Sequence, residues 1–387
     1  MKRKKVSELA KQIRGVSYKT EDLHENLDEN SVTLLRANNI FEGRINFDDV
    51  VYVDKSRVAR EQYLCKGDIL VCTSSGSKQL VGKAASFNFD TECTFGAFCK
   101  VVRPNQDVAN YLSMYFQSNA YRRKISEVAI GANINNIRNE HIDALKLPIG
   151  SNAENEKVVA SFSLLQQIID GRKQQLHKLD ELIKARFVEL FGDGNHPHIA
   201  LIDLIIEGAG LSYGIVQPGD DGTGDMGVLR PVDMVDGKIS TASIKYIDRS
   251  IGDGFKKTEL YGDELLITVR GTTGITALTD IRFNGMNVTR GIAVVRYDRN
   301  KINPVYLNAY LNTDESQRYI QEHTRGATLQ QINLSDLRVQ QIMVPPLALQ
   351  EQMAAFIEQT DKSKVAVQKA LDEAQLLFDS LMQQYFG

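Results

Sequence analysis

The sequence has no tryptophan and only four cysteines in 387 residues. The cysteines, which form no CxxC pair and have no neighbouring histidine, are Cys65, Cys72, Cys93 and Cys99. This pattern indicates neither a disulfide framework nor a common zinc site. We expect reduced, structural cysteines in a cytoplasmic protein, with a zinc site as the alternative.

Long apolar runs are also missing. No segment approaches the roughly 18 apolar residues that a membrane span needs, so we expect no membrane partner. Residues 2–5 are basic like the start of a signal peptide, but residues 6–15 are mixed polar, which does not indicate secretion. We interpret residues 2–5 as a flexible, solubilising end that could also touch phosphate.

Signatures of catalysis are absent too. The sequence contains no HExxH motif, no glycine-rich cofactor fingerprint after a strand, and no Asn/Asp-Pro-Pro-Tyr/Phe motif of the amino-methyltransferase type. Residues 76–83 resemble a phosphate-binding loop, but Ser77 replaces the required glycine and Ala84 replaces Ser or Thr. We therefore assign no catalytic residue, no bound cofactor and no metal site to this chain.

The charge of the chain is nearly balanced. The net charge is −3, which argues against a free-standing, highly cationic DNA binder. Residues 1–192 carry 28 Lys and Arg against 24 Asp and Glu, and the remainder carries 18 against 25. If the protein binds nucleic acid, another molecule must neutralise many of the phosphates.

The most informative feature is an internal repeat with an offset of about 195 residues. Matching segments keep one order along the whole chain: 15–18 with 210–213, 35–36 with 229–230, 67–68 with 262–263, 131–132 with 326–327, and 191–192 with 386–387. Matches that keep one offset over the whole chain, with shifts of only one residue, are not expected by chance. The chain is a tandem duplication.

Each copy divides in the same way. About 150 residues contain short β-type runs, such as 68–73 and 264–269, between Gly, Asn and Asp turns. An apolar stripe of nearly 40 residues follows, about 57 Å of helix. We predict an α+β fold with mixed α/β domains at 1–152 and 193–348, and long helices at 153–192 and 349–387.

The stripes have the three-and-four spacing of a heptad seam. Its positions are Val158, Phe162, Leu165, Ile169, Arg172, Leu176, Leu179, Ile183, Arg186 and Leu190, and then Met353, Ile357, Thr360, Lys364, Val367, Leu371, Ala374, Phe378, Leu381 and Tyr385. We expect the two helices to pair antiparallel as a coiled coil that acts as a spacer between two heads.

The heads share polar, glycine-containing segments at matching places. Segment 73–78 corresponds to 268–273, and 131–138 corresponds to 326–333. Asn and Gln can pair with adenine, Arg with guanine, and small hydroxyls with either. The alternative is that these residues only tie down turns. The candidate DNA contacts, to bases or to phosphates, are Thr73, Ser74, Ser75, Ser77, Lys78, Asn133, Asn135, Asn136, Arg138, Arg270, Thr272, Thr273, Arg290, Arg325, Thr328, Gln330, Gln331 and Asn333.

A basic cluster at 122–124 is a candidate contact to DNA phosphates, through Arg122 and Arg123. A solvated helix face explains this cluster equally well.

Taken together, these patterns resemble a known family, the specificity (S) subunits of type I restriction–modification systems. The resemblance covers the whole chain. It rests on Leu-Arg with Asp/Glu-Gly-x-Ile near 35–45 and 229–239, Gly-Asp-x-Leu/Ile at 67–70 and 262–265, and Gly-Ala-x-x-x-x-Ile at 131 and 326. The helices ending in Leu-Phe-Gly and Tyr-Phe-Gly complete it.

The resemblance implies two target-recognition domains that read a bipartite, asymmetric site in double-stranded DNA, with the helices fixing the gap. It also implies a non-catalytic subunit. Two methyltransferase (M) subunits would use S-adenosylmethionine, and two restriction (R) subunits, where present, would use ATP and Mg²⁺. Three alternatives remain: a type II-like relative with the same reading role, a coiled-coil scaffold whose heads bind proteins, and an unrecognised enzyme.

Overall fold

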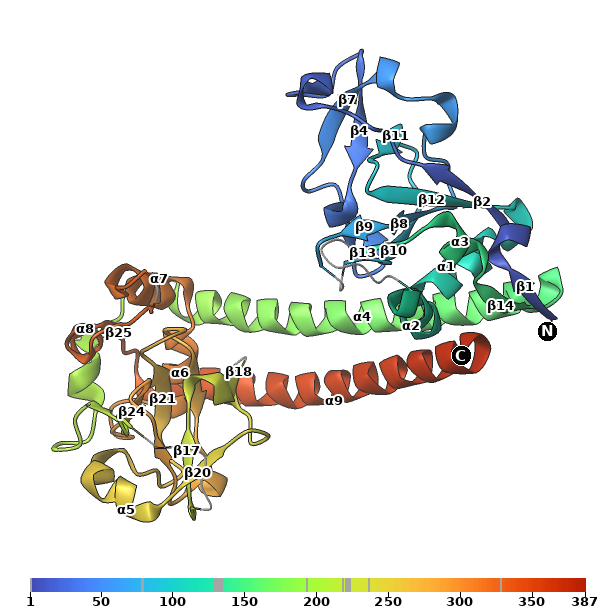
Figure 1. The fold of residues 1–387 in the computed structure, drawn as a ribbon. Helices are drawn as coiled ribbons and strands as arrows, with labels where there is room; N and C mark the ends of the chain where they lie inside the picture. The colour runs from blue at the N-terminus through green and yellow to red at the C-terminus, as the bar shows by residue number, and fades with distance from the viewer. Residues whose placement is uncertain are drawn as a thin grey trace. The chain divides into compact units, whose positions relative to one another are not determined.

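The computed structural model describes the chain except for residues 1, 78–79, 129–134, 193, 218, 220–223, 236 and 328. It divides into unit 1, formed by Met1–Lys173 and Gln368–Gly387, and unit 2, formed by Gln174–Val367. The division falls within both long helices, whereas the sequence suggested boundaries at their ends. Each unit therefore contains an α/β head and half of each helix (Figure 1).

The larger sheet of unit 1 is antiparallel, with the order β10-β8-β12-β2. Its strands are β10 (Ala84–Phe87), β8 (Asp68–Cys72), β12 (Cys99–Pro104) and β2 (Ala10–Arg14). All of β8 is buried, because its two faces pack into different hydrophobic clusters. A strand covered on both sides has a continuous apolar sequence, which is the signal that predicted a strand at 68–73.

The second sheet of unit 1 has the order β11-β4-β7-β3, with β11 parallel to β4. Its strands are β11 (Cys93–Phe95), β4 (Ser31–Leu35), β7 (Val51–Asp54) and β3 (Leu23–His24). The two-stranded pairs are β1 (Lys2–Lys5) with β14 (Lys146–Ile149), β5 (Ile40–Phe41) with β6 (Arg44–Ile45), and β9 (Ser74–Ser75) with β13 (Asn135–Asn136). Side chains of α1 (Ala109–Gln117), α2 (Asn119–Val128) and α3 (Asn139–Asp143) share a core with one face of the larger sheet.

Unit 2 repeats this order of strands, with three strands instead of four in the described part of its second sheet. Its larger sheet, β16-β24-β21-β22, consists of β16 (Ser212–Tyr213), β24 (Ile292–Val295), β21 (Leu265–Thr268) and β22 (Thr276–Leu278). Its second sheet, β20-β17-β23, consists of β20 (Lys245–Ile247), β17 (Met226–Leu229) and β23 (Asn287–Val288), with β23 parallel to β17. The two-stranded pairs are β15 (His198–Ala200) with β25 (Gln341–Met343), and β18 (Met234–Val235) with β19 (Lys238–Ile239).

The helices of the second head are α5 (Arg249–Gly252), α6 (Pro304–Leu311), α7 (Asp314–His323) and α8 (Leu334–Val339). The matching strand orders confirm the tandem duplication in three dimensions.

A buried ion pair recurs in both heads and corrects part of the sequence alignment. Arg103 donates to Asp68 at 2.6 and 2.7 Å, while Arg296 lies 3.8 Å from Glu264. Both carboxylates are 1% exposed. The sequence aligned Asp68 with Asp263, but the buried counterpart is Glu264, because the turn before β21 places its glycine one position earlier.

The alignment of residues 15–18 with 210–213 is also wrong. Gly15 corresponds to Gly214, since the residue after each donates its N–H to the second sheet, Val16 to Phe95 and Ile215 to Val288. A Cβ atom on Gly15 would lie 2.1 Å from the oxygen of Gly96, and one on Gly214 would lie 2.0 Å from that of Val288. Only glycine fits at these two crossings.

The two long helices are α4 (Asn152–Phe191) and α9 (Leu347–Phe386). In unit 1, the first half of α4 packs on the second half of α9, with the Phe162 ring 5.2 Å from that of Phe378 and 6.3 Å from that of Phe386. In unit 2, the second half of α4 packs on the first half of α9, where Lys364 lies 2.7 Å from Asp180. This confirms the antiparallel pairing. Every predicted seam position is buried or half-buried.

The first residues were expected to be a flexible end, and this was wrong. Residues Lys2–Lys5 form β1, which is antiparallel to β14 with Lys5 opposite Lys146. All four side chains are exposed, so β1 is an ordered, basic edge strand. Among the residues that the structure describes, no helix is both long and apolar enough to cross a membrane.

Candidate nucleic-acid interface

In unit 1, the two segments predicted to read bases lie side by side. β9 and β13 pair antiparallel, with Ser74 opposite Asn136. The N–H of Ile137 then donates to the carbonyl oxygen of Thr73 at 2.8 Å. Segments far apart in the sequence therefore share one surface, held by main-chain hydrogen bonds that leave their side chains available.

Unit 2 brings together the corresponding segments by the same main-chain pattern. Arg270 forms a β-bridge with Gln331, and the N–H of Ile332 donates to the carbonyl oxygen of Val269 at 3.0 Å. Each head thus joins the segment after one inner strand of its larger sheet, β8 or β21, to the segment before a short helix, α3 or α8.

The register of these pairings shifts the predicted correspondence by one residue. The sequence aligned Thr73 with Thr268. The hydrogen bonds place Thr73 at the position of Val269 instead, because each accepts from the matching isoleucine. Ser74 is therefore the counterpart of Arg270.

A hollow of about 510 Å³ opens beside β9 and β13 in unit 1. Four of the predicted residues line it: Thr73, Ser74, Asn136 and Arg138. Thr73 is 2% exposed, with its hydroxyl bonded to the carbonyl oxygen of Phe98 at 3.2 Å. It therefore supports the wall, while the side chains of the other three are at least partly accessible.

Sequence reasoning missed three residues of this hollow: Arg14, Phe98 and Lys100. Arg14 ends β2 and lies opposite Lys100 on β12. Phe98 lies in the turn between β11 and β12 and is 70% exposed. A usable signal was present at Lys100, which is the charged residue in an otherwise apolar run at 99–102.

Arg14 and Lys100 make this hollow electropositive. Burial lowers the pKa of the Lys100 amine, the charge of Arg14 lowers it further, and Asp143 opposes the shift. Lys100 also bonds to the side chain of Asn139. Like charges at opposed positions of neighbouring strands repel each other, and an anion placed between them would relieve that repulsion.

The remaining predicted residues of unit 1 have different surroundings. The guanidinium of Arg122 donates to the carbonyl oxygen of Val81 at 2.8 Å and is half-buried, so it supports the fold. Arg123 and Ser77 are exposed. Arg138 lies 3.4 Å from the carboxylate of Glu140.

In unit 2, some predicted residues bond to neighbours and others project outward. The hydroxyls of Thr273 and Thr324 are 3.0 Å apart, and Arg325 lies 3.8 Å from Asp336. The amide of Gln331 donates to Asn333 at 3.5 Å. The exposed candidates are Thr272, Arg290, Arg325 and Gln330.

Lys78, Asn133 and Thr328 lie outside the described residues. Asn135 belongs to β13, but its side chain is outside the description as well.

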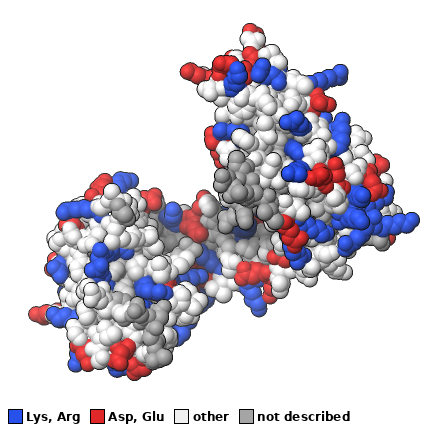
Figure 2. Space-filling view, in the orientation of Figure 1, with Lys and Arg blue, Asp and Glu red and all other residues white. Residues whose placement is uncertain are grey.

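The cluster at 122–124 lies close to the basic edge strand β1. Burial lowers the pKa of Lys124, and the charges of Arg3 and Arg123 lower it further. On the face drawn in Figure 2, basic and acidic side chains are interspersed over each unit. Any positive surface that this face offers is therefore local, as the net charge of the chain predicted.

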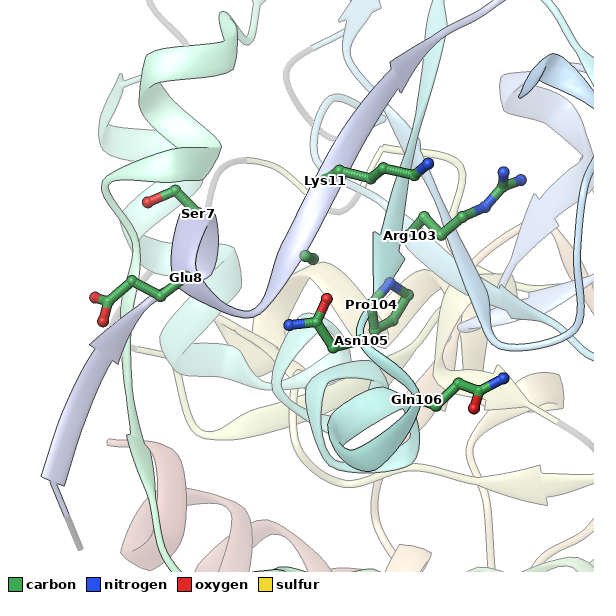
Figure 3. Close-up of a pocket in the computed structure, with 8 residues that line it drawn as sticks. Ser7, Glu8, Lys11, Arg103, Pro104, Asn105 and Gln106 are labelled. Atoms are coloured by element: carbon green, nitrogen blue, oxygen red, sulfur yellow. The ribbon is translucent and has the colours of Figure 1, made fainter.

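A second hollow of about 490 Å³ lies at the other end of the β2–β12 pair, lined by Glu8, Lys11 and Arg103 among others (Figure 3). The guanidinium of Arg103 already bonds to Asp68 and to the carbonyl oxygen of Tyr63 at 2.7 Å. Only Lys11 offers an accessible cation here, which makes this a weaker candidate than the first hollow.

No group of three or more His, Cys, Asp or Glu residues able to hold a metal occurs within the described part of the chain. All four cysteines are free, and only Cys65 is exposed. Burial raises the pKa of Cys93 to about 12, with a smaller contribution from Glu92. Its thiol is therefore protonated and unreactive at neutral pH.

Comparison with known proteins agrees with this architecture. Residues 1–181 and 225–374 match the model of the type I restriction modification DNA specificity domain. The chain is 28% identical over 400 residues to the type I restriction enzyme StySPI specificity subunit of Salmonella potsdam. It is 26% identical over 401 residues to the EcoKI specificity subunit of Escherichia coli K12. Each match covers 98% of this chain and 86% of the relative.

Solved structures show the same fold. The S subunit of a type I restriction–modification system from M. genitalium superposes with a TM-score of 0.57 at 14% identity, covering 100% of this chain and 96% of that one. A chain from a structure of type I restriction–modification complex assembly and conformational transition gives 0.60 at 14% identity, covering 100% and 97%.

Proposed function

The chain belongs to the family of type I restriction–modification DNA specificity proteins, and from this premise we propose that its two heads read the two halves of a split, asymmetric DNA site. It is the DNA sequence-recognition subunit of such a system. The relatives it matches are specificity subunits, which are non-catalytic. Membership of this family does not favour the alternative of a scaffold whose heads bind only proteins.

One observation gives the most direct support for a DNA site whose two halves are read by different heads. The two heads hold the same pair of segments by the same main-chain hydrogen bonds, yet the side chains differ at equivalent positions. Ser74 corresponds to Arg270, Asn136 to Gln331 and Arg138 to Asn333. Because Arg favours guanine and Asn or Gln favours adenine, the halves should differ in sequence.

The chemistry on DNA then belongs to partners. Methylating an adenine in duplex DNA requires flipping it out of the stack, at a cost of a few kcal/mol. We place that step, with S-adenosylmethionine, on two methyltransferase subunits, and ATP and Mg²⁺ on restriction subunits. The net charge of −3 supports this assignment, since partners must supply part of the phosphate neutralisation.

The first test is the genome-wide adenine methylation pattern with the gene intact and deleted. We expect a split, asymmetric motif that disappears on deletion and returns when the gene is restored. If the pattern does not change, the gene is expressed together with the neighbouring methyltransferase in a host that lacks other such systems, and the methylation motif is measured there. No new motif there would contradict the proposal.

Arg270→Ala tests the assignment of one half-site to each head. We expect discrimination to relax at one position of the half-site read by unit 2, by about 1–3 kcal/mol. The other half-site should be unchanged. Gln330→Ala should act within the same half-site if its side chain also reads a base. The readout is the methylation motif, and Arg282→Ala, which breaks an exposed ion pair with Asp280, is the control. Equal loss in both halves would show that the assignment is wrong.

A further inference from the structure

A short turn joins the two sheets in each head and is built in the same way in both. In unit 1 it links β11 to β12, and the carbonyl oxygen of Phe98 accepts the N–H groups of Thr73 and Ser74 at 2.9 and 3.1 Å. In unit 2 it links β23 to β24, and the carbonyl oxygen of Gly291 accepts the N–H of Val269 at 2.8 Å. The turn is therefore fixed to the segment that carries the predicted base contacts.

The two turns present opposite chemistry. Head 1 has Ala97-Phe98 where head 2 has Arg290-Gly291. Arg290 is exposed, while a Cβ atom on Gly291 would lie 2.6 Å from Cγ of Pro231, so no side chain fits there. Phe98 is the most exposed phenylalanine among the described residues, at 70%.

The surroundings of Phe98 suit a nucleic acid better than an apolar partner. Its ring borders the hollow that also contains Arg14, Lys100, Asn136 and Arg138, all polar or charged. Arg14 forms no ion pair within the described part of the chain. The cations and amides around the ring suit a ligand that is anionic and polar. The ring itself suits an isolated apolar group on that ligand.

We propose that Phe98 is a specificity-determining residue whose ring contacts the C5-methyl group of a thymine in the half-site read by head 1. This inference rests on the proposed function. On the major-groove edge of DNA, the thymine methyl is the apolar group, and phenylalanine is among the side chains that contact it. Arg14 and Lys100 hold the adjacent phosphates, and the fixed backbone of the turn positions the ring. Head 2 reads its half-site without such a contact, because Gly291 occupies the position.

The experiment uses the chain assembled with its methyltransferase partners and duplexes that contain the recognised site. Each thymine of the head-1 half-site is replaced singly by uracil, which removes only the methyl group. We expect one position at which binding weakens about fourfold, the factor that corresponds to burying one methyl group. In Phe98→Ala, thymine and uracil at that position should bind equally, while Phe98→Leu should retain part of the difference.

Controls separate this role from general damage. Phe41→Ala removes another exposed phenylalanine of head 1 and should leave the preference for thymine intact. Replacing thymine by uracil in the head-2 half-site should change the binding affinity by the same factor in the parent complex and in Phe98→Ala. The inference fails if no thymine of the head-1 half-site responds to uracil, or if Phe98→Ala weakens thymine and uracil duplexes by the same factor, as a ring wedged between base steps would. If the complex shows no sequence preference at all, the proposed function itself fails.

Discussion

At the scale of single residues, the two heads differ in side chains carried on matching main-chain frames. Ser74 and Arg270 occupy one frame position, and Asn136 and Gln331 occupy another. Such positions can change without loss of fold, because the hydrogen bonds that define them use backbone atoms. The ion pair of Arg103 with Asp68, by contrast, is buried and serves the fold.

Arg14 offers a test in which DNA binding should weaken without any loss of stability. Arg14→Gln should weaken DNA binding similarly for all sequences and lower the slope of log affinity against log salt by about 1. The same change should leave the stability of head 1 unchanged or slightly higher, since repulsion with Lys100 is removed. Salt titrations of the assembled complex, together with thermal denaturation, measure both.

Lys66→Gln is the matched control, because Lys66 forms an exposed ion pair with Asp90 in the same head. An unchanged salt slope in Arg14→Gln would remove Arg14 from the phosphate contacts.

At the scale of elements, the long helices were predictable and the reading surface was only partly so. A three-and-four spacing is a local signal that any helix displays, and each seam position, including the polar Lys364 and Thr360, is at least half-buried. Arg14 and Phe98 could not be found in this way. They meet only because β2 pairs with β12, and no local pattern encodes strand pairing over such a distance.

The internal repeat predicted more of the reading surface than the hydrophobic periodicity did. It predicted that segments 73–78 and 131–138 have a shared role, and the structure places the described parts of both on one surface. It failed by one residue at Asp263, because an alignment follows the glycine of a turn whereas the fold preserves the buried carboxylate that comes after it. The sequence comparison missed this shift, because the glycine and the aspartate still match at the offset of 195 residues.

The helix seam can be tested at Phe162, which is 1% exposed among the rings of Phe378, Tyr385 and Phe386. Phe162→Ala should destabilise unit 1 by about 3–5 kcal/mol, because it leaves a cavity in the core. Leu164→Ala in the same helix, at a side chain that is 60% exposed, should cost far less. Urea denaturation, monitored by amide hydrogen exchange in unit 1, compares the free energies of unfolding of the two variants. Similar losses would mean that the seam contributes little.

At the scale of the whole molecule, unit 1 is completed by residues distant in sequence. Its core contains Val6 and Leu9 together with Met382 and Phe386, and the guanidinium of Arg3 donates to the carbonyl oxygen of Gly387 at 3.3 Å. Unit 2, in contrast, is one continuous stretch of the chain.

Removing residues 368–387 should therefore affect the two units differently. A variant ending at Val367 should lose cooperative folding of unit 1, because Phe378, Met382 and Phe386 leave its core. Unit 2 should remain folded. Amide hydrogen exchange distinguishes the units, and a synthetic peptide of residues 368–387 should restore protection in unit 1. The same peptide carrying Phe386→Ala should restore less. Full protection of unit 1 without any peptide would contradict this account.

The discontinuity of unit 1 also sets an order of events on the ribosome. Unit 2 has all its residues as soon as Val367 has been added, whereas unit 1 still lacks residues 368–387. At roughly 5–20 residues per second, residues 368–387 are added about 1–4 s later. During that interval the first head presents an uncovered apolar surface. The nascent chain thus finishes its second half first, and the head made earliest is the last to close.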